Sequence, residues 1–332
     1  MSKAKHIAIV GATGAVGIEM LQCLEQRDFP VAGIKLLASA RSAGQKRVFR
    51  GEELVVEELT EDSFGGVDIA LFSAGGGISE QFAPFAVASG ATVIDNSSAF
   101  RMRGDVPLVI PELNATAAAR HQGVIANPNC TTIVSLMALA PLHRLFGVRR
   151  VIASSYQAVS GSGAAGIREL EQQVRALVAG EQPVIEVYPR QIAFNVLPQV
   201  DAFTDNGYTK EEMKFVNESR KILNAPDLKA SVTCVRVPVY RSHSVAICAE
   251  FERMVDLDEA RRAIDAAPGV AMHDDPSAGV YPTPLDVSGR DACMVGRLRR
   301  DLVFENGLSF WVVGDQVRKG AALNAVQIAE LL

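Results

Sequence analysis

The sequence predicts a two-domain protein of the α/β class, in which a doubly wound parallel sheet comes first and an α+β domain follows. A β-branched run at 6–10 leads directly into Gly-Ala-Thr-Gly-Ala-Val-Gly at 11–17. Strand-like and helical segments alternate as far as residue 126, and the alternation ends at Cys130. A glycine-rich turn between a first strand and a first helix is typical of a Rossmann-type domain, which we therefore expect at the N-terminus.

Short apolar runs are expected to form the strands of the first domain. They lie at 6–10, 34–38, 54–57, 69–73, 92–95 and 124–126. Amphipathic stretches at 18–27 and 79–89 are expected to be helices. Because strands that alternate with helices form a parallel sheet covered on both faces, these segments predict a mostly parallel, doubly wound sheet.

The second domain is predicted to be α+β, because its strand-like runs come without regular helices between them. The strands are expected at 151–159, 232–239 and 244–251, and the helices at 167–179, 210–223 and 257–267. The amphipathic segment 320–332 predicts a C-terminal helix that packs back on the first domain, since a terminal helix needs a docking face. We therefore expect a dinucleotide-binding domain at 1–127 plus 316–332, and a second domain at 128–315.

The glycines at 11, 14 and 17 indicate a dinucleotide site. Glycine lets the backbone turn tightly and approach a pyrophosphate, which is then held at the N-terminus of the following helix. A glycine-rich turn alone is a weak signal, but here it follows a strand and opens a helix. The predicted cofactor-binding residues of this turn are Gly11, Thr13, Gly14, Ala15, Val16 and Gly17.

The end of the second predicted strand favours NADP over NAD as the cofactor. A protein that binds NAD usually carries an acidic residue there, which holds the ribose 2′-hydroxyl. This chain has Ser39, Arg41 and Ser42 instead, and an arginine with two hydroxyl groups suits a 2′-phosphate. The alternative interpretation is that Arg41 is a solvated loop arginine.

A further glycine-rich segment, Ser-Ala-Gly-Gly-Gly at 73–77, follows another predicted strand. Ligands of such folds bind at the carboxyl edge of the sheet. Ala74 and Gly75 are therefore candidates for a second wall of the cofactor site, although a plain flexible turn explains the glycines nearly as well.

Cys130 is the candidate nucleophile. It follows the turn-forming residues Asn-Pro-Asn at 127–129 and precedes an apolar run that predicts a helix. A thiol at a helix N-terminus faces unpaired N–H groups and the positive end of the helix dipole, which both favour the reactive thiolate. The other cysteines lie among apolar or strand-like neighbours and fit buried structural positions: Cys23, Cys234, Cys248 and Cys293.

A reactive thiolate needs a partner for proton transfer, and histidine is the usual choice. His243 lies between two strand-like runs and is flanked by basic residues, which makes it only a modestly better candidate than a structural histidine. Gln157 ends a predicted strand and leads into the glycine-rich stretch 160–166. That stretch is able to bring backbone close to a ligand, but an ordinary strand-to-helix connection remains open.

Composition and charge exclude several classes of protein. The chain has 332 residues, which is too many for one ordinary core, and its net charge of −5 argues against nucleic acid or an anionic membrane as a partner. Its five cysteines have no framework spacing and fit a reducing compartment. No apolar run is long enough to span a bilayer, and no signal peptide is expected. We therefore expect a cytoplasmic protein without a metal site.

Several motifs together resemble the aspartate-semialdehyde dehydrogenase family. They are GATGAVG, SARSAG, SSAFR at 97–101, NPNCTT, YQAVSGSGAAG, EEMK at 211–214, VRVPVYRSHS and the C-terminal KGAALNAVQIAE. They occur in the family's order and extend from residue 11 to residue 330, so the resemblance covers nearly the whole chain. It implies a homodimer, with catalysis and dimerisation in the second domain.

The activity that the resemblance implies is the NADPH-dependent reductive dephosphorylation of L-aspartyl 4-phosphate to L-aspartate 4-semialdehyde, in lysine, threonine and methionine biosynthesis. The implied catalytic residues are the nucleophile Cys130, the acid/base group His243, and Gln157, which orients the acyl intermediate. The implied substrate ligands are Arg236 for the α-carboxylate, Glu211 for the α-amino group, and Arg101, Lys214 and Asn96 for phosphate. Ser160, Gly161 and Asn324 are expected beside the nicotinamide.

The physical chemistry of these residues agrees with the implied roles. The planar fork of Arg236 suits a carboxylate, and Glu211 and Lys214 share one face of a predicted helix. Without the resemblance, Glu211 and Lys214 are better explained as a surface ion pair, and Arg101 as a solvated loop residue. Ser162 departs from the family pattern, in which a small residue is usual, but it removes no chemical group.

Other functions remain open at this point. A second NADP-linked acyl-phosphate reductase, of the N-acetyl-glutamyl-phosphate reductase type, shares the plan of one cysteine and one histidine. A catalytically inactive NADP-binding paralogue is less well supported, because it would be expected to have lost Cys130 or His243. A glyceraldehyde-phosphate dehydrogenase is suggested by the fold alone, without its longer motifs.

Overall fold

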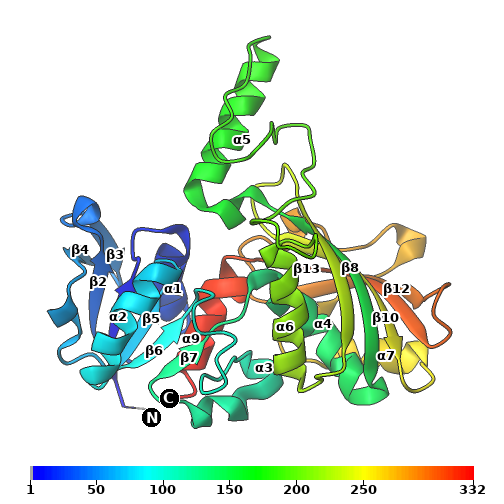
Figure 1. Cartoon of the computed structure of the whole chain (residues 1–332), viewed down its shortest axis with the longest axis horizontal. Helices are drawn as coiled ribbons and strands as arrows, with labels where there is room; N and C mark the ends of the chain where they lie inside the picture. The colour runs from blue at the N-terminus through cyan, green and yellow to red at the C-terminus, as the bar shows by residue number, and fades with distance from the viewer. Residues whose placement is uncertain (1–2) are drawn as a thin grey trace. The chain divides into compact units, whose positions relative to one another are not determined.

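The computed structural model describes residues 3–332, which form two compact units (Figure 1). The first unit comprises the described residues up to Asn129 together with Ala321–Leu332, and the second is Cys130–Gly320. The units therefore meet in the sequence slightly beyond the expected positions 127/128 and 315/316. Residues 315–320 belong to the second unit because Asp315 accepts a hydrogen bond from Nε of Arg241 at 2.6 Å, and Gln316 accepts one from the N–H of Ser242 at 2.7 Å.

The first unit contains a seven-stranded sheet in the order β3-β4-β2-β1-β5-β6-β7. Its strands are β1 (Lys5–Val10), β2 (Val31–Ala38), β3 (Lys46–Phe49), β4 (Glu52–Glu58), β5 (Ile69–Phe72), β6 (Thr92–Asp95) and β7 (Val124–Ala126). All neighbouring pairs are parallel except β3 and β4. The predicted parallel sheet is confirmed. Strand β3 was not predicted from the sequence, because it is short, lies antiparallel at the sheet edge and has little apolar character.

The helices of the first unit are α1 (Ala15–Gln26), α2 (Gly76–Ala88), α3 (Pro111–Asn114) and α9 (Leu323–Ala329). The first two begin earlier than predicted. The expected starts at 18 and 79 were too late, because Gly14 and Gly75 stand in non-helical conformations directly before the first turns. Residues 320–332 are not one helix, since a π-helical turn (Arg318–Ala322) precedes α9.

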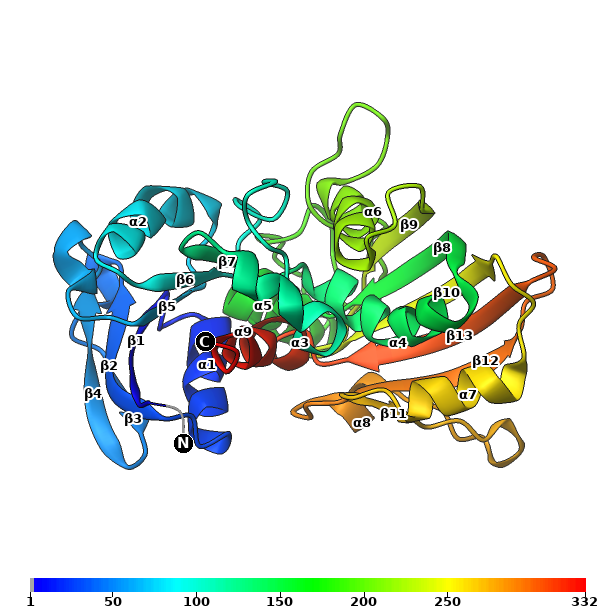
Figure 2. The same ribbon diagram turned by 90° about the horizontal axis from the view of Figure 1, so that it is seen from below.

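The C-terminal helix packs on the first unit, as predicted. Buried side chains of α9, such as Leu323 and Val326, belong to the same core as Met20 and Leu24 of α1. Figure 2 shows the two helices side by side. The burial of this face explains why the last turns of the chain return to the N-terminal sheet.

The second unit contains a six-stranded mixed sheet in the order β11-β12-β13-β10-β8-β9. Its strands are β8 (Val148–Gln157), β9 (Lys229–Arg236), β10 (His243–Phe251), β11 (Val270–Met272), β12 (Cys293–Arg300) and β13 (Gly307–Gly314). The predicted α+β architecture is confirmed. The predicted ranges 151–159 and 232–239 lie about three residues C-terminal to the observed strands β8 and β9. The polar residues at the start of each strand explain this displacement, because they do not fit an apolar strand pattern.

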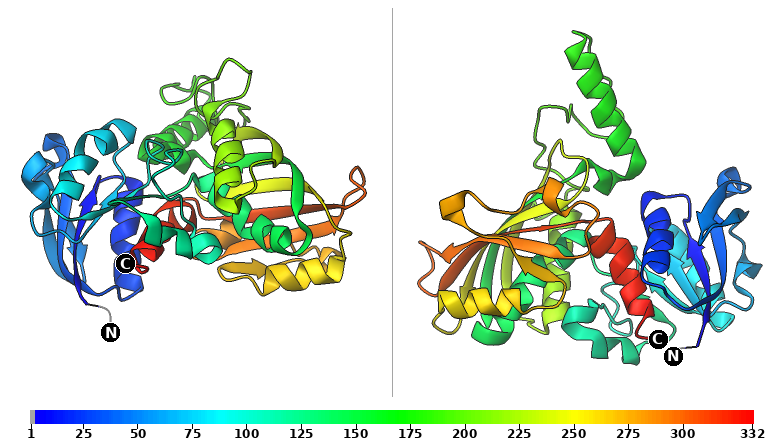
Figure 3. Two further views of the ribbon diagram at one scale, coloured as in Figure 1. Left: turned by 60° about the horizontal axis from the view of Figure 1, so that its bottom comes forward. Right: turned by 180° about the vertical axis from the view of Figure 1, so that it is seen from behind.

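Helices cover one face of this sheet. They are α4 (Cys130–Phe146), α6 (Lys210–Leu223) and α7 (Leu257–Asp265), which contact the strands directly. A further short helix, α8 (Pro284–Val287), contacts β13. Helix α5 (Gly163–Val178), expected at 167–179, and the chain that returns from it project from the sheet (Figure 3). Helix α6 has its predicted bounds, while α7 ends two residues before the expected 267. No helix within residues 3–332 is long and apolar enough to cross a membrane.

Candidate active site

Cys130 is the first residue of α4, and its side chain is half-buried. The first N–H groups of a helix lack partners within the helix, and their partial positive charge stabilises a thiolate. The backbone of Gly320 lies against this residue, since a Cβ atom at Gly320 would stand 2.9 Å from Cβ of Cys130. Glycine at 320 is therefore needed to keep Cys130 in position, a requirement that was not predicted from the sequence.

The other cysteines are structural. Cys23, Cys234 and Cys293 are buried as predicted, whereas Cys248 is half-buried because it lies on the open face of the sheet. Burial, and then the charge of Glu211, raise the pKa of the Cys234 thiol. A negative charge on Cys130 also raises the pKa of Cys234, so the two sulfur atoms are close enough to interact electrostatically.

The ends of three neighbouring strands bring Gln157, Arg236 and His243 together. Gln157 and Arg236 are paired at the ends of the parallel strands β8 and β9. His243 begins β10, which runs antiparallel to β8 with Ser244 opposite Tyr156. All three side chains are buried. The register of the sheet thus assembles residues that are distant in the sequence.

The amide of Gln157 has a fixed orientation. Its Oε1 atom accepts a hydrogen bond from Oγ of Ser155 at 3.1 Å, and its Nε2 atom donates to Oε1 of Glu211 at 3.1 Å. Nε2 of His243 lies 3.4 Å from the same amide nitrogen. Gln157 therefore lies between the histidine and the carboxylate of Glu211 in α6.

The backbone of Ala158 holds both His243 and Arg236. Its N–H donates to Nδ1 of His243 at 3.1 Å, and its carbonyl accepts from Nη1 of Arg236 at 2.6 Å. Burial, and then the positive charge of Arg236, lower the pKa of His243 well below its ordinary value of 6.5. The ring is therefore neutral near pH 7.

Arg236 lines a cavity of about 210 Å³, together with Ser162, Tyr188 and Asp201. Gly161 leaves room beside it, because a Cβ atom there would lie 2.7 Å from Nη1 of Arg236 and 3.4 Å from Nε2 of His243. A guanidinium group at a small open cavity suits a carboxylate ligand. Tyr188 and Asp201 were not predicted as site residues, because they lie in an irregular segment without a recognisable motif.

Helix α6 presents Glu211 and Lys214 on one face, as their spacing predicts. Nζ of Lys214 donates to Oε2 of Glu211 at 3.1 Å and to Oδ2 of Asp201 at 2.9 Å. Burial alone would lower the pKa of Lys214, but the two carboxylates raise it overall. Lys214 is therefore a fixed positive charge.

Ser160 is linked to the residue before His243 through Gln316. Nε2 of Gln316 donates to Oγ of Ser160, and its Oε1 atom accepts the N–H of Ser242 at 2.7 Å. Ser242 has a φ of 75°, a left-handed conformation that is uncommon for a residue other than glycine. Gln316 thereby helps to hold the start of β10. Gln316 was not predicted as a site residue, although it lies in a polar run directly after a buried strand.

The glycine-rich turn of the first unit has the geometry that a dinucleotide requires. Gly11 has a φ of 87°, and a Cβ atom there would lie 2.6 Å from the carbonyl oxygen of Ser73. A Cβ atom at Gly17 would overlap the carbonyl of Gly11, so helix and strand pack closely. Gly14 precedes α1 without a side-chain cap, which leaves the first N–H groups of this helix for a ligand.

The remaining predicted cofactor residues lie at the same edge of the first sheet. Ser39, Arg41 and Ser42 follow β2 in a short 3-10 turn, with Arg41 exposed. Ala74 and Gly75 follow β5, and the backbone N of Ala74 would lie 3.2 Å from a Cβ atom at Gly11. Thr13, Ala15 and Val16 complete the turn into α1. These residues fit a nicotinamide dinucleotide with its pyrophosphate at α1.

Arg101 and Asn96 are held together in the first unit. Arg101 is buried, and its guanidinium group donates to the carbonyl oxygens of Asn127 at 2.9 Å and Asn96 at 2.7 Å. Both polar atoms of the Asn96 side chain are buried and lack a hydrogen-bond partner within residues 3–332. Because unsatisfied buried amides are rare in proteins, Asn96 is a candidate ligand of a bound polar group.

Asn324 is fully buried, and its amide serves the structure of the first unit. Its Nδ2 atom donates to the carbonyl of Val109 at 3.0 Å and to Oδ1 of Asn127 at 2.5 Å. Asn127 belongs to the turn that precedes Cys130 in the sequence. The role of Asn324 beside the nicotinamide stays a prediction, and its observed contacts tie α9 to this turn.

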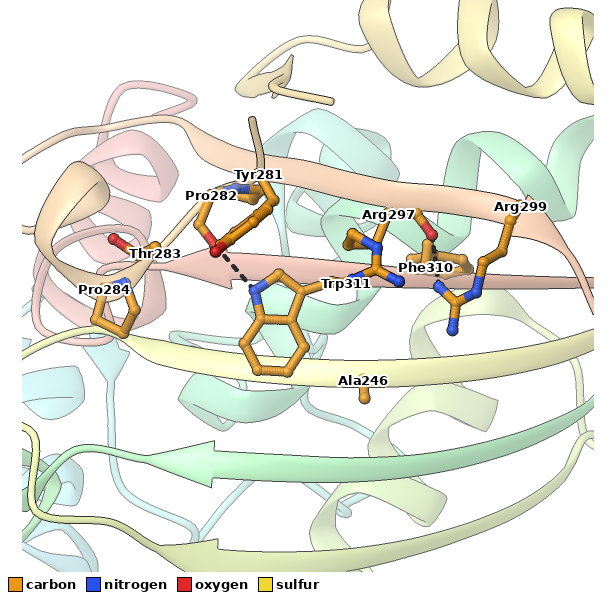
Figure 4. A pocket seen from close by; sticks show the side chains of 9 residues that line it. All are labelled: Ala246, Tyr281, Pro282, Thr283, Pro284, Arg297, Arg299, Phe310 and Trp311. Atoms are coloured by element: carbon orange, nitrogen blue, oxygen red, sulfur yellow. Dashed lines mark hydrogen bonds between the residues drawn. The ribbon is translucent and has the colours of Figure 1, made fainter. Parts of the chain in front are cut away.

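A larger hollow lies on the open face of the six-stranded sheet and contains none of the predicted site residues. Its volume is about 290 Å³, and Trp311, Tyr281 and Pro282 line it together with two arginines (Figure 4). Nε1 of Trp311 donates to the carbonyl of Pro282 at 3.0 Å. Its aromatic and aliphatic lining favours a protein surface over a polar substrate as the ligand.

Comparisons with known proteins agree with this arrangement. The family model of the semialdehyde dehydrogenase NAD binding domain matches residues 6–121, and that of the semialdehyde dehydrogenase dimerisation domain matches residues 139–319. The aspartate-semialdehyde dehydrogenase of Bacillus subtilis is 49% identical over 100% of this chain and 98% of its own length. That of Aquifex aeolicus is 52% identical over 98% of this chain and 97% of its own.

A solved structure extends the likeness to three dimensions. The crystal structure of aspartate semialdehyde dehydrogenase II from Vibrio cholerae, complexed with ASA, has a TM-score of 0.97. It is 46% identical, and the match covers 100% of this chain and 98% of the other. The likeness therefore includes both units.

Proposed function

The chain belongs to the aspartate-semialdehyde dehydrogenase family, and we propose that Cys130 is its nucleophile. It is an oxidoreductase of amino-acid biosynthesis that catalyses the reductive dephosphorylation of L-aspartyl 4-phosphate to L-aspartate 4-semialdehyde. The observation that carries the assignment of residues is the buried cluster of Gln157, Arg236 and His243 at adjoining strand ends. This cluster lies in the same unit as the half-buried thiol of Cys130.

The proposed mechanism passes through a thioester on Cys130. The thiolate attacks the acyl carbon of aspartyl phosphate, the bond to the phosphate oxygen breaks, and inorganic phosphate leaves. A bound nicotinamide supplies the hydride that converts the thioester to a thiohemiacetal. Collapse of this adduct restores the thiolate and releases the aldehyde, while His243 moves the proton of the adduct's hydroxyl group. Gln157 orients the acyl group, since its own amide is held at both ends.

The proposed substrate contacts follow from charge. The guanidinium group of Arg236 pairs with the α-carboxylate, and Glu211 accepts from the α-ammonium group. Arg101, Lys214 and Asn96 are proposed to bind phosphate. The buried, unsatisfied amide of Asn96 and the fixed positive charge of Lys214 support this assignment.

We propose NADP as the cofactor of the NAD(P)-binding domain. Arg41 is exposed directly after β2, where an acidic residue would hold the ribose of NAD. The pyrophosphate is proposed to bind at Gly11–Gly17, with Ala74 and Gly75 beside it. Ser160, Gly161 and Asn324 are proposed to contact or support the nicotinamide.

The enzyme is proposed to be a cytoplasmic homodimer. Residues 139–319 match a dimerisation domain, and the sheet face opposite α4, α6 and α7 is largely open within residues 3–332. On that face lie Ile152, which is 54% exposed, and the rings of Tyr156 and Trp311, whose centroids are 5.3 Å apart. Five free cysteines support a reducing compartment.

The reverse reaction tests the proposal. Aspartate semialdehyde, phosphate and NADP or NAD are mixed with the protein, and the absorbance of the reduced cofactor is followed. We expect reduction of NADP that depends on phosphate. Equal activity with the N-acetyl-glutamyl analogue would favour the related reductase instead, and no activity with either aldehyde would favour an inactive paralogue.

A further inference from the structure

The ammonium group of Lys214 is held between two carboxylates. Its Nζ atom lies 2.9 Å from Oδ2 of Asp201 and 3.1 Å from Oε2 of Glu211. The side chain of Glu211 is only 7% exposed, whereas that of Asp201 is 35% exposed. The two carboxylates therefore form a binding site for one primary ammonium ion, and the site is open to solvent on the side of Asp201.

Asp201 also lines the cavity of Arg236. Arg236 and Asp201 are both among the residues that line this cavity of about 210 Å³. Burial alone would raise the pKa of Asp201, but the hydrogen bond from Lys214 and the N–H of Ala202 lower it overall. A small cavity with one fixed cation and one fixed anion matches the two charges of an α-amino acid.

The local backbone fixes which oxygen of Asp201 is presented. Asp201 has a φ of 69°, a left-handed conformation that aspartate and asparagine tolerate better than most residues. Its Oδ1 atom accepts the N–H of Ala202 at 2.7 Å. Oδ2 is therefore the atom that faces Lys214, and an asparagine at 201 would keep the conformation while removing the charge.

We propose that Asp201 is a second carboxylate, beside Glu211, that binds the α-ammonium group of the substrate. This inference rests on the proposed function, in which Arg236 binds the α-carboxylate. The Lys214 ammonium stands in for the substrate's ammonium, which has the same charge and the same three N–H donors. When substrate binds, its ammonium group replaces that of Lys214 between Asp201 and Glu211, and Lys214 becomes available to phosphate.

A merely structural ion pair would behave differently. A partly exposed pair of a lysine and an aspartate contributes little to stability, and its loss should affect all ligands alike. Recognition of the α-ammonium group should instead appear only with ligands that carry one. The substrate and its deamino analogue, 4-oxobutanoate, differ in that group alone.

The experiment compares wild-type enzyme with Asp201→Asn in the reverse reaction. We measure the KM of aspartate semialdehyde, and the inhibition constant of 4-oxobutanoate against it. We expect the KM to rise about 10- to 100-fold, because a hydrogen bond between charged groups is lost. The inhibition constant should change by less than about twofold, and the KM of phosphate should not rise. Asp205→Asn, which removes a charge from an exposed residue nearby in the same segment, is the matched control.

Both constants are independent of the fraction of folded enzyme, so partial misfolding does not obscure the result. An unchanged KM for aspartate semialdehyde, or equal weakening of both ligands, would overturn the role of Asp201. A wild-type enzyme without phosphate-dependent turnover of aspartate semialdehyde would instead refute the proposed function. The two failures are therefore distinguishable.

Discussion

The backbone N–H of Ala158 donates a hydrogen bond of 3.1 Å to Nδ1 of His243. A neutral imidazole has one donor and one acceptor nitrogen, so the hydrogen of this ring resides on Nε2. The Nε2 atom lies 3.4 Å from the amide nitrogen of Gln157, which is itself a donor. Two donors cannot pair, so the Nε2–H group is not hydrogen-bonded to Gln157 and is available to an acceptor atom of a bound substrate.

Acid should destabilise the protein through His243. The pKa of His243 is lowered below 6.5 by burial and by Arg236, so the unfolded chain binds this proton more readily than the folded one. Stability that is present above pH 6.5 is then lost as the pH falls below this value. His243→Asn keeps an acceptor for Ala158 but does not titrate, so its unfolding free energy should fall less between about pH 7.5 and about pH 5.

Denaturant unfolding at the two pH values provides the measurement. The wild type should lose more stability on acidification than the variant does. Parallel losses in the two proteins would show that His243 is not held neutral by its surroundings.

Removal of the Cys130 thiol should separate binding from chemistry. Cys130→Ala should bind NADPH with the affinity of the wild type, as followed by quenching or enhancement of cofactor fluorescence. It should show no phosphate-dependent turnover, because no other described thiol lies at a helix N-terminus. Cys248→Ala, which alters a half-buried cysteine on the open sheet face, should retain activity. Appreciable turnover by Cys130→Ala would rule out the thioester.

Local sequence patterns predicted those parts of the protein that depend on neighbouring residues. The glycines from Gly11 to Gly17 and the turn before Cys130 carry their signals within a few positions, and the structure confirms the strand, turn and helix around them. The register that pairs Gln157 with Arg236 is different, because it depends on contacts between strands that are far apart in the chain. Only the resemblance to a family placed these two residues in one site.

Other functional positions had no local signal. Asp201 lies in an irregular segment, and its contact with Lys214 arises only when α6 is folded against that segment. Gly320 is one glycine among many, and only the approach of its backbone to Cys130 shows that a side chain is not tolerated there. Edge strand β3 could not be predicted from an apolar sequence pattern, because its stability comes from pairing with β4.

Substitution of Gly320 should disturb Cys130 without removing it. In Gly320→Ala the new methyl group would lie 2.9 Å from Cβ and 3.3 Å from Cα of Cys130, so the start of α4 must move. Overpacking of this kind costs roughly 1–3 kcal/mol, and we expect kcat to fall by at least about tenfold. Gly104→Ala is the control, since nothing lies within 4 Å of its Cβ position. A fully active Gly320→Ala enzyme, with Cys130 equally reactive toward iodoacetamide, would refute the constraint.

Arg41 should determine the choice between NADP and NAD. Its guanidinium group is exposed at the end of β2, and no acidic residue occupies the position that would bind the ribose of NAD. In Arg41→Ala the 2′-phosphate would lose a hydrogen bond between charged groups, so the KM of NADP should rise roughly 10- to 100-fold. The KM of NAD, which lacks this phosphate, should change little and serves as the control within the same preparation. If the KM values of both cofactors rise equally, Arg41 supports the fold of the turn and does not bind the 2′-phosphate.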